Sequence, residues 1–162
     1  MNVIGIIPAR MGSSRYPGKP LEKIHGMPMI GHCYYRTSMA LGIKKTYVAT
    51  CDVEIYDYIT SIGGNVIMTA DTHTRATTRT AEALEKIEIE IGETIGTVVM
   101  VQGDEPLIHP GIIGETVAHF HDQSVNIVNI MSRLVDKESF EDENNVKVVV
   151  SNSNDALYYS RE

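Results

Sequence analysis

The feature that most constrains the fold is a regular alternation between short apolar runs and longer segments with helical spacing. Four short apolar runs are predicted as strands: residues 3–9, 46–50, 65–69 and 97–102. The first run is apolar on both faces, which is typical of a strand in a parallel sheet that is covered on both sides. Strands that alternate with helices imply right-handed crossovers, so the sequence predicts an α/β fold with a mainly parallel sheet and helices on both faces.

The segments between these runs repeat their apolar residues every three or four positions, as amphipathic helices do. The predicted helices are residues 29–41, 53–62, 79–91 and 110–121. Leu41 is expected to belong to the buried stripe of the first helix, and Asp52 is expected to cap the second. Thr77 or Thr78 could serve as the N-cap of the third helix.

The last third of the chain is predicted to add further strands. The apolar runs 125–131, 146–150 and 156–160 are expected to be extended, with a polar connection over residues 136–145. The sequence shows no internal repeat and no interdomain linker, so residues 1–162 are expected to form one domain.

Composition excludes several classes of partner. The formal net charge of -7 disfavours nucleic acid and acidic membrane as partners, so an anion site must be a local cluster of cations. The apolar run at the N-terminus is expected to be a buried strand and not a signal peptide, and no run is long enough for a membrane span. Cys33 and Cys51 are expected to be reduced, buried thiols of a cytoplasmic protein.

The loop "ARMGSSRYPGKP", residues 9–20, concentrates positive charge directly after the first predicted strand. Its glycines let the backbone approach a ligand, and Arg10, Arg15 and Lys19 can pair with phosphate oxygens. The loop therefore resembles a phosphate cradle, although it matches neither the Walker sequence nor the dinucleotide fingerprint. An exposed basic turn is the alternative interpretation.

Two other loops carry polar chemistry. In "QGDEPLI", Asp104 follows a strand end and could hold Mg2+ together with phosphate oxygens and water, or simply cap a turn. Glu105 is expected to point elsewhere. The loop 71–79 could contact a nucleobase or only cap a helix. None of the six histidines is expected to be a metal ligand.

Five segments carry a family resemblance: "IIPARMGSSRYPGKPLEKIHGMPMI", "YVATCD", "HTRATTRTAEA", "VVMVQGDEPLI" and "NNVKVVVSNSNDALYYSR". In order and spacing they resemble the 3-deoxy-manno-octulosonate (KDO) cytidylyltransferases. The resemblance implies a Rossmann-like nucleotidyltransferase fold. It also implies transfer of CMP from CTP to KDO, an eight-carbon acidic sugar, with release of pyrophosphate, for lipopolysaccharide assembly and with a requirement for Mg2+.

The same resemblance implies roles for particular residues. The CTP triphosphate would be held by Arg10, Ser13, Arg15 and Lys19, with Ala9 and Arg10 near the nucleoside. Arg79 would lie by the cytosine and the sugar, Gln102 would face the sugar, and Asp104 would ligate Mg2+. Arg15 and Lys19 would also offset the charge that builds on the leaving pyrophosphate.

Two departures from the family pattern leave alternatives open. Arg75-Ala76-Thr77-Thr78 stands where the family has Ser-Gly-Thr-Glu, so the acceptor could be a KDO relative such as an amino-substituted form. Family members are also longer, so the chain is expected to be truncated at its C-terminus and to lack much of the sugar pocket. The full-length protein is expected to be a homodimer, and the missing C-terminal part would contain much of the dimer interface. Two alternative functions stay open: a module that binds CTP without turnover, and a nucleotidyltransferase with another base or sugar.

Overall fold

The computed structural model describes residues 2–12 and 16–162 and divides into two compact units, residues 1–126 and 127–162. The expectation of one domain over residues 1–162 stays a prediction.

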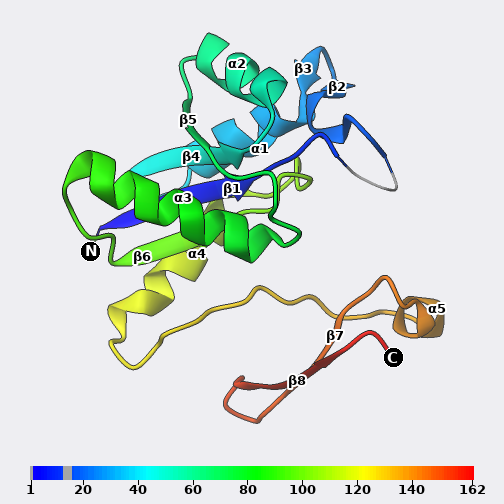
Figure 1. Ribbon diagram of the computed structural model, residues 1–162. Coiled ribbons are helices and arrows are strands. Elements are labelled where there is room, and N and C mark those ends of the chain that lie inside the picture. Colours follow the sequence, from blue (N-terminus) through cyan, green and yellow to red (C-terminus); the bar gives the residue numbers. More distant parts are fainter. Residues whose placement is uncertain (1, 13–15) are drawn as a thin grey trace. The chain divides into compact units, whose positions relative to one another are not determined.

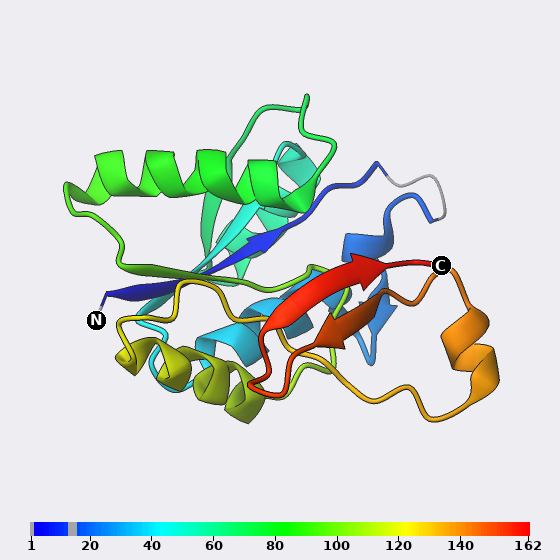
Figure 2. The same ribbon diagram turned by 90° about the horizontal axis from the view of Figure 1, so that it is seen from below.

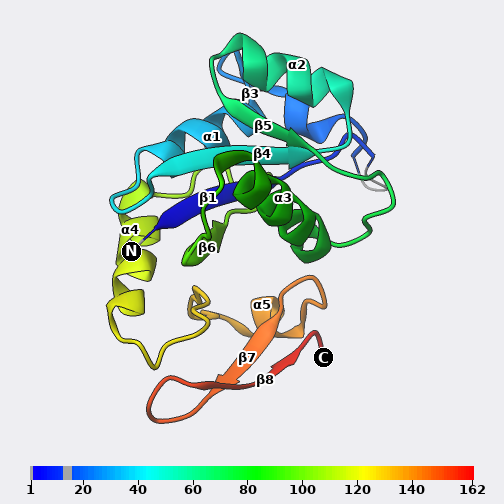
Figure 3. The same cartoon turned by 60° about the vertical axis from the view of Figure 1, so that its left-hand side comes forward.

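A four-stranded parallel sheet forms the centre of the first unit, with the strand order β5-β4-β1-β6 (Figures 1 and 3). Its strands are β1 (Val3–Pro8), β4 (Lys45–Thr50), β5 (Asn65–Met68) and β6 (Thr97–Met100). All three pairings in this sheet are parallel. The predicted α/β fold with a mainly parallel sheet is therefore confirmed.

Helices cover both faces of this sheet. They are α1 (Met29–Ser38), α2 (Val53–Ser61), α3 (Ala76–Ile91) and α4 (Pro110–Ala118). On one face, Ala83 and Ile87 of α3 pack with Ile6 of β1 in one buried cluster. Figure 2 shows α3 on one side of the sheet with α1 and α4 on the other.

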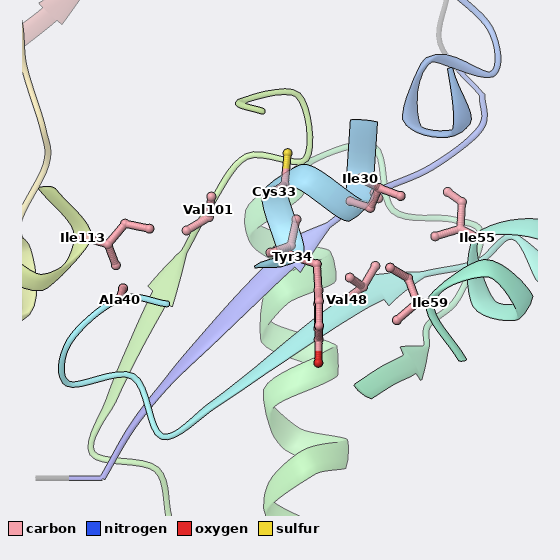
Figure 4. Packing of buried hydrophobic residues seen from close by; sticks show 11 residues of the cluster. Ile30, Cys33, Tyr34, Ala40, Val48, Ile55, Ile59, Val101 and Ile113 are labelled. Atoms are coloured by element: carbon pink, nitrogen blue, oxygen red, sulfur yellow. The ribbon is translucent and has the colours of Figure 1, made fainter. Parts of the chain in front are cut away.

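The second face carries the larger buried cluster. Side chains from α1, α2 and α4 pack there against β1 and β4, and Figure 4 shows them converging. Ile7, Ile30 and Val48 are fully buried in this cluster. Tyr34 reaches across it, and its hydroxyl accepts a hydrogen bond of 3.2 Å from the backbone N–H of Asn65, which fixes the start of β5.

Short elements complete the first unit. They are η1 (Lys19–Leu21), β2 (Lys23–Ile24), β3 (Met27–Pro28) and η2 (His119–His121). β2 and β3 form a small antiparallel ribbon directly before α1. The glycine-rich loop therefore joins the end of β1 to this ribbon through η1.

The second unit contains α5 (Lys137–Glu141) and the antiparallel pair β7 (Lys147–Val150) and β8 (Ala156–Ser160). The predictions of strands near 146–150 and 156–160 are confirmed. The prediction of a strand over 125–131 is wrong, because these residues have no regular structure. An apolar sequence forms a strand only when a neighbouring strand pairs with it, and no described strand pairs with this run.

Two helix predictions also need correction. The first helix ends at Ser38, so Leu41 lies beyond it and is 81% exposed instead of buried. The third helix begins at Ala76, three residues before its predicted start. Among the described residues, every helix is too short or too polar to cross a membrane.

Substitution of two isoleucines on α3 tests how much the hydrophobic core contributes to the free energy of unfolding. Ile87 is fully buried against the sheet, whereas Ile89 on the same helix is 82% exposed. We expect Ile87→Ala to lower the free energy of unfolding by about 2–5 kcal/mol, because it removes buried methyl groups and leaves a cavity. Ile89→Ala should change it by less than about 0.5 kcal/mol. Urea denaturation measures both, and equal losses would contradict the packing described above.

Candidate active site

The loops that follow β1, β5 and β6 meet at the carboxyl-end edge of the sheet and line a pocket of about 320 Å³. Its described lining residues come from residues 8–12 and 19–20, 73–79 and 102–104, together with Met29 of α1. In parallel α/β sheets this edge is where ligands bind. All of these residues belong to the first unit.

Lys19 and Asp104 join two of these loops across the pocket. Lys19 Nζ lies 2.9 Å from Asp104 Oδ2, and the two side chains are 42% and 48% exposed. An ion pair this exposed stabilises a fold by less than about 1 kcal/mol. Its importance is positional, because it shows that a cation after β1 and a carboxylate after β6 face the same space.

The loop after β1 is anchored at both ends. Gly18 has φ 78°, a left-handed conformation that suits glycine, and its N–H donates to the carbonyl of Met11 at 2.9 Å. The N–H of Met11 in turn donates to Asp52 Oδ2 at 2.7 Å. Asp52 occupies the N-cap position of α2, but its side chain makes no capping hydrogen bond and holds the loop instead. Sequence reasoning assigned it only the cap.

The loop after β6 passes very close to the end of β1. A Cβ atom on Gly103 would lie 2.8 Å from the carbonyl oxygen of Pro8, so only glycine fits without a backbone shift. Gln102 and Asp104 flank this glycine and both line the pocket. The close approach therefore fixes where their side chains enter the site.

Arg79 places a positive charge at the inner wall. It is 3% exposed, donates to Thr69 Oγ1, and its Nη2 lies 3.4 Å from Cys51 Sγ. Both partners are uncharged in their ordinary form, so these contacts do not neutralise the guanidinium. Cys51 was expected to be buried but is partly exposed, because it lies just past the end of β4.

The third wall is the start of α3. Arg75 is the N-cap residue and makes no side-chain capping bond, so the expectation of Thr77 or Thr78 at that position is wrong. The hydroxyl of Thr78 donates instead to the Arg75 carbonyl at 3.0 Å. The first-turn amides of this 16-residue helix therefore have no side-chain cap.

Glu82 and His73 form a pair beside this helix start. His73 Nε2 contacts Glu82, and the other ring nitrogen lies 3.0 Å from Thr78 Oγ1. Lys86 lies 2.7 Å from Glu82, and the Ala70 N–H donates to the same carboxylate. The hydrogen bonds from Lys86, His73 and Ala70, in that order, lower the pKa of Glu82 to about 2. The charge of Glu82 is thus already paired within the protein.

The pocket has an excess of positive charge although the protein is acidic. Four cationic side chains line it, and Asp104 is the one carboxylate among its described lining residues; the cations are Arg10, Lys19, Arg75 and Arg79. The whole chain has a formal net charge of -7. Such a local concentration of cations suits a polyanion such as a nucleoside triphosphate.

Most of the residues predicted for the site lie together. The pocket is lined by Ala9, Arg10, Lys19, Arg79, Gln102 and Asp104. Ser13 and Arg15 fall outside the described residues. Sequence reasoning assigned no pocket role to His73 and named Arg75 only as a departure from the family pattern. The spacing of four residues between Glu82 and Lys86 predicts the ion pair of these two residues, but it gives no signal for the contact of Glu82 with His73.

The donor set of the pocket fits Mg2+ that is bound jointly with phosphate. Mg2+ typically uses one or two carboxylates and takes its remaining ligands from substrate oxygens and water. Asp104 supplies one carboxylate. Within the described residues, no group of three His, Cys, Asp or Glu side chains could hold a metal ion alone.

Comparison with known proteins identifies the family. The sequence profile described as cytidylyltransferase matches residues 4–162. This chain belongs to the cytidylyltransferase family. A solved structure, described as CMP:2-keto-3-deoxy-manno-octonic acid synthetase complexed with CTP, superimposes with a TM-score of 0.86. It is 34% identical and covers 99% of this chain, which spans 64% of that structure.

Two curated cytidylyltransferases act on related sugars. The 8-amino-3,8-dideoxy-manno-octulosonate cytidylyltransferase of Shewanella pealeana is 42% identical over 99% of the chain, and the chain spans 65% of its length. The 3-deoxy-manno-octulosonate cytidylyltransferase of Geobacter metallireducens is 41% identical over 99% of the chain, and the chain spans 61% of its length. The chain therefore spans less than two thirds of either relative.

The lowered pKa of Glu82 predicts a pH dependence of stability. Its ordinary pKa is 4.5 and the folded value is about 2, so its stabilising contribution is complete above pH 4.5 and is lost as the pH falls toward 2. We expect Glu82→Gln to flatten the fall of the urea midpoint over this range. Glu85→Gln is the control, because Glu85 lies on the same helix and its side chain makes no hydrogen bond or ion pair within the described residues. Identical pH profiles for wild type and Glu82→Gln would contradict the assignment.

Proposed function

We propose that the chain is the nucleotide-binding part of an enzyme that transfers CMP from CTP to 3-deoxy-manno-octulosonate or a close acidic relative. The observation that carries this proposal is the meeting of Lys19 and Asp104, 2.9 Å apart, in a pocket lined by further cations. The family, and the CTP named with the solved relative, support the choice of nucleotide.

The cations of loop 9–20 would bind the triphosphate of CTP. Arg10 is exposed and Lys19 is partly exposed, so both can reach phosphate oxygens without a rearrangement of the core. On binding, Lys19 would exchange the Asp104 carboxylate for a phosphate oxygen. Ser13 and Arg15 are proposed partners from the sequence. Ala9 is proposed to lie near the nucleoside.

The carboxylate that Lys19 releases would then be free to hold Mg2+, with the other ligands from phosphate and water. Bound Mg2+ would screen the negative charge of the phosphate oxygens at the reacting centre. Asp104 would hold Mg2+ at a defined position, because the backbone of the neighbouring Gly103 lies against the end of β1.

The proposed reaction is a single displacement at phosphorus. A hydroxyl oxygen of the sugar attacks the α-phosphorus of CTP, the bond to the bridging oxygen breaks, and pyrophosphate leaves with its electron pair while the hydroxyl proton passes to solvent. Arg15 and Lys19 would offset the charge on the leaving group, and Gln102 and Arg79 would orient the sugar and the cytosine. Positioning and electrostatics supply the catalysis.

The setting of the enzyme follows from its proposed substrates. Because CTP is an intracellular nucleotide, we place the reaction in the cytoplasm, where the activated sugar would serve lipopolysaccharide assembly. A homodimer of the full-length protein belongs to the same proposal.

A second candidate function is CTP binding without turnover. It is favoured by the lining of the pocket, whose cations and one described carboxylate are suited to bind phosphate and Mg2+ but include no residue assigned to accept the hydroxyl proton. Calorimetry with CTP and Mg2+ beside a pyrophosphate assay separates the two functions. Binding of CTP with no release of pyrophosphate at any sugar concentration would favour the second.

Asp104→Asn tests the proposed transfer. Loss of the carboxylate should lower the rate of pyrophosphate release by about 10²–10³-fold, the range seen when one electrostatic stabiliser is removed. Glu105→Gln is the matched control, since Glu105 is the adjacent carboxylate and does not line the pocket. Its rate should stay within about twofold of wild type. An unchanged rate in Asp104→Asn would overturn the assignment of Asp104.

A further inference from the structure

Two guanidinium groups at the pocket have no partner within the described residues. Lys19 pairs with Asp104, and Arg79 is held by Thr69 and Cys51. Arg10 and Arg75 line the same pocket, are exposed, and make no hydrogen bond or ion pair with another described residue through their side chains. Both are therefore available for a ligand.

Arg10 and Arg75 stand on different loops of the same pocket. Arg10 belongs to the loop after β1, together with the cations proposed to bind the triphosphate. Arg75 is the N-cap of α3, where the uncapped first-turn amides add further positive potential. The proposed function assigns the nucleotide phosphates to the first loop, so Arg75 and the helix start would be available to the acceptor sugar.

Among the described residues that line the pocket, none offers a free carboxylate to a cation, and Asp71, which precedes Arg75 on the same loop, is not among them. Asp104 is paired with Lys19 and is the proposed metal ligand. Glu82 lies behind His73 and is bonded to Lys86, His73 and the Ala70 N–H. A positively charged group on the acceptor would therefore approach Arg75 without a compensating anion.

The acceptors named for the two curated relatives differ in this respect. One is 3-deoxy-manno-octulosonate, which carries a single carboxylate. The other carries an amino group at carbon 8, and a primary amine is protonated at neutral pH, so this acceptor has no net charge. A pocket with excess positive charge distinguishes the two by electrostatics alone.

We propose that Arg75 is a specificity-determining residue that makes the pocket favour the unmodified, anionic octulosonate over the 8-amino acceptor. This inference rests on the proposed function. Arg75 acts through its charge, which attracts the acceptor anion and repels an ammonium group.

A charge series at position 75 tests the inference. Pyrophosphate release is measured with each acid at saturating CTP and Mg2+ for wild type, Arg75→Lys, Arg75→Ser and Arg75→Glu. The readout is the kcat/KM for the unmodified octulosonate divided by the kcat/KM for the 8-amino acceptor. Serine is chosen because it is a favoured N-cap residue and preserves the start of α3.

The wild-type ratio should exceed one and should persist in Arg75→Lys. It should fall about two- to fivefold in Arg75→Ser and by a similar factor again in Arg75→Glu, as expected for exposed charge pairs. Added salt should reduce these differences, because exposed charges are screened. Lys44→Ser is the control: it removes an exposed cation just before β4, at the opposite edge of the sheet, and should leave the ratio unchanged.

The remaining outcomes separate the two proposals. Turnover of both acids with the same ratio in every variant, or a wild-type preference for the amino acceptor, would overturn the role of Arg75 and leave the cytidylyltransferase proposal standing. No pyrophosphate release with either acid would overturn both.

Discussion

The parallel pairing of β1 with β6 is the constraint on which the site depends. Ile6 of β1 lies opposite Met100 of β6, and the N–H of Val101 continues the ladder to the Ile6 carbonyl at 3.0 Å. Parallel strands end at the same edge, so the two loops must meet there. β1 is buried on both faces, and Ile6 and Ile7 are fully inaccessible. The hydrophobic core thereby fixes the position of a site that is itself polar and open.

The polar contacts of the site stabilise the protein little, and their function is to set geometry. The exposed Lys19–Asp104 pair can be exchanged at small cost when phosphate and Mg2+ bind. The backbone that carries it is held more firmly, by the hydrogen bond from Met11 to Asp52 and by the contact of Gly103 with Pro8. A rigid frame with weakly paired charges is suited to hold an anionic substrate without prior reorganisation.

Sequence periodicity predicted the sheet and its covering helices because burial on one helix face, or on both strand faces, leaves a local pattern. The pattern fails where structure depends on distant partners. Residues 125–131 have a strand-like sequence but no described strand pairs with them, and Leu41 follows a helix that has already ended. For the site, loop chemistry predicted Arg10, Lys19 and Asp104. The resemblance to KDO cytidylyltransferases added Arg79 and Gln102. The bond of Asp52 to Met11, the His73–Glu82 pair and the uncapped start at Arg75 are tertiary features that a linear pattern does not contain.

A crystal structure of the chain with CTP and Mg2+ would show directly whether this pocket binds the nucleotide. We expect the triphosphate in the pocket between loop 9–20 and residues 102–104. Lys19 should have left Asp104 for a phosphate oxygen, and the metal should be bound to Asp104. A nucleotide bound elsewhere on the molecule, with the Lys19–Asp104 pair intact, would contradict it.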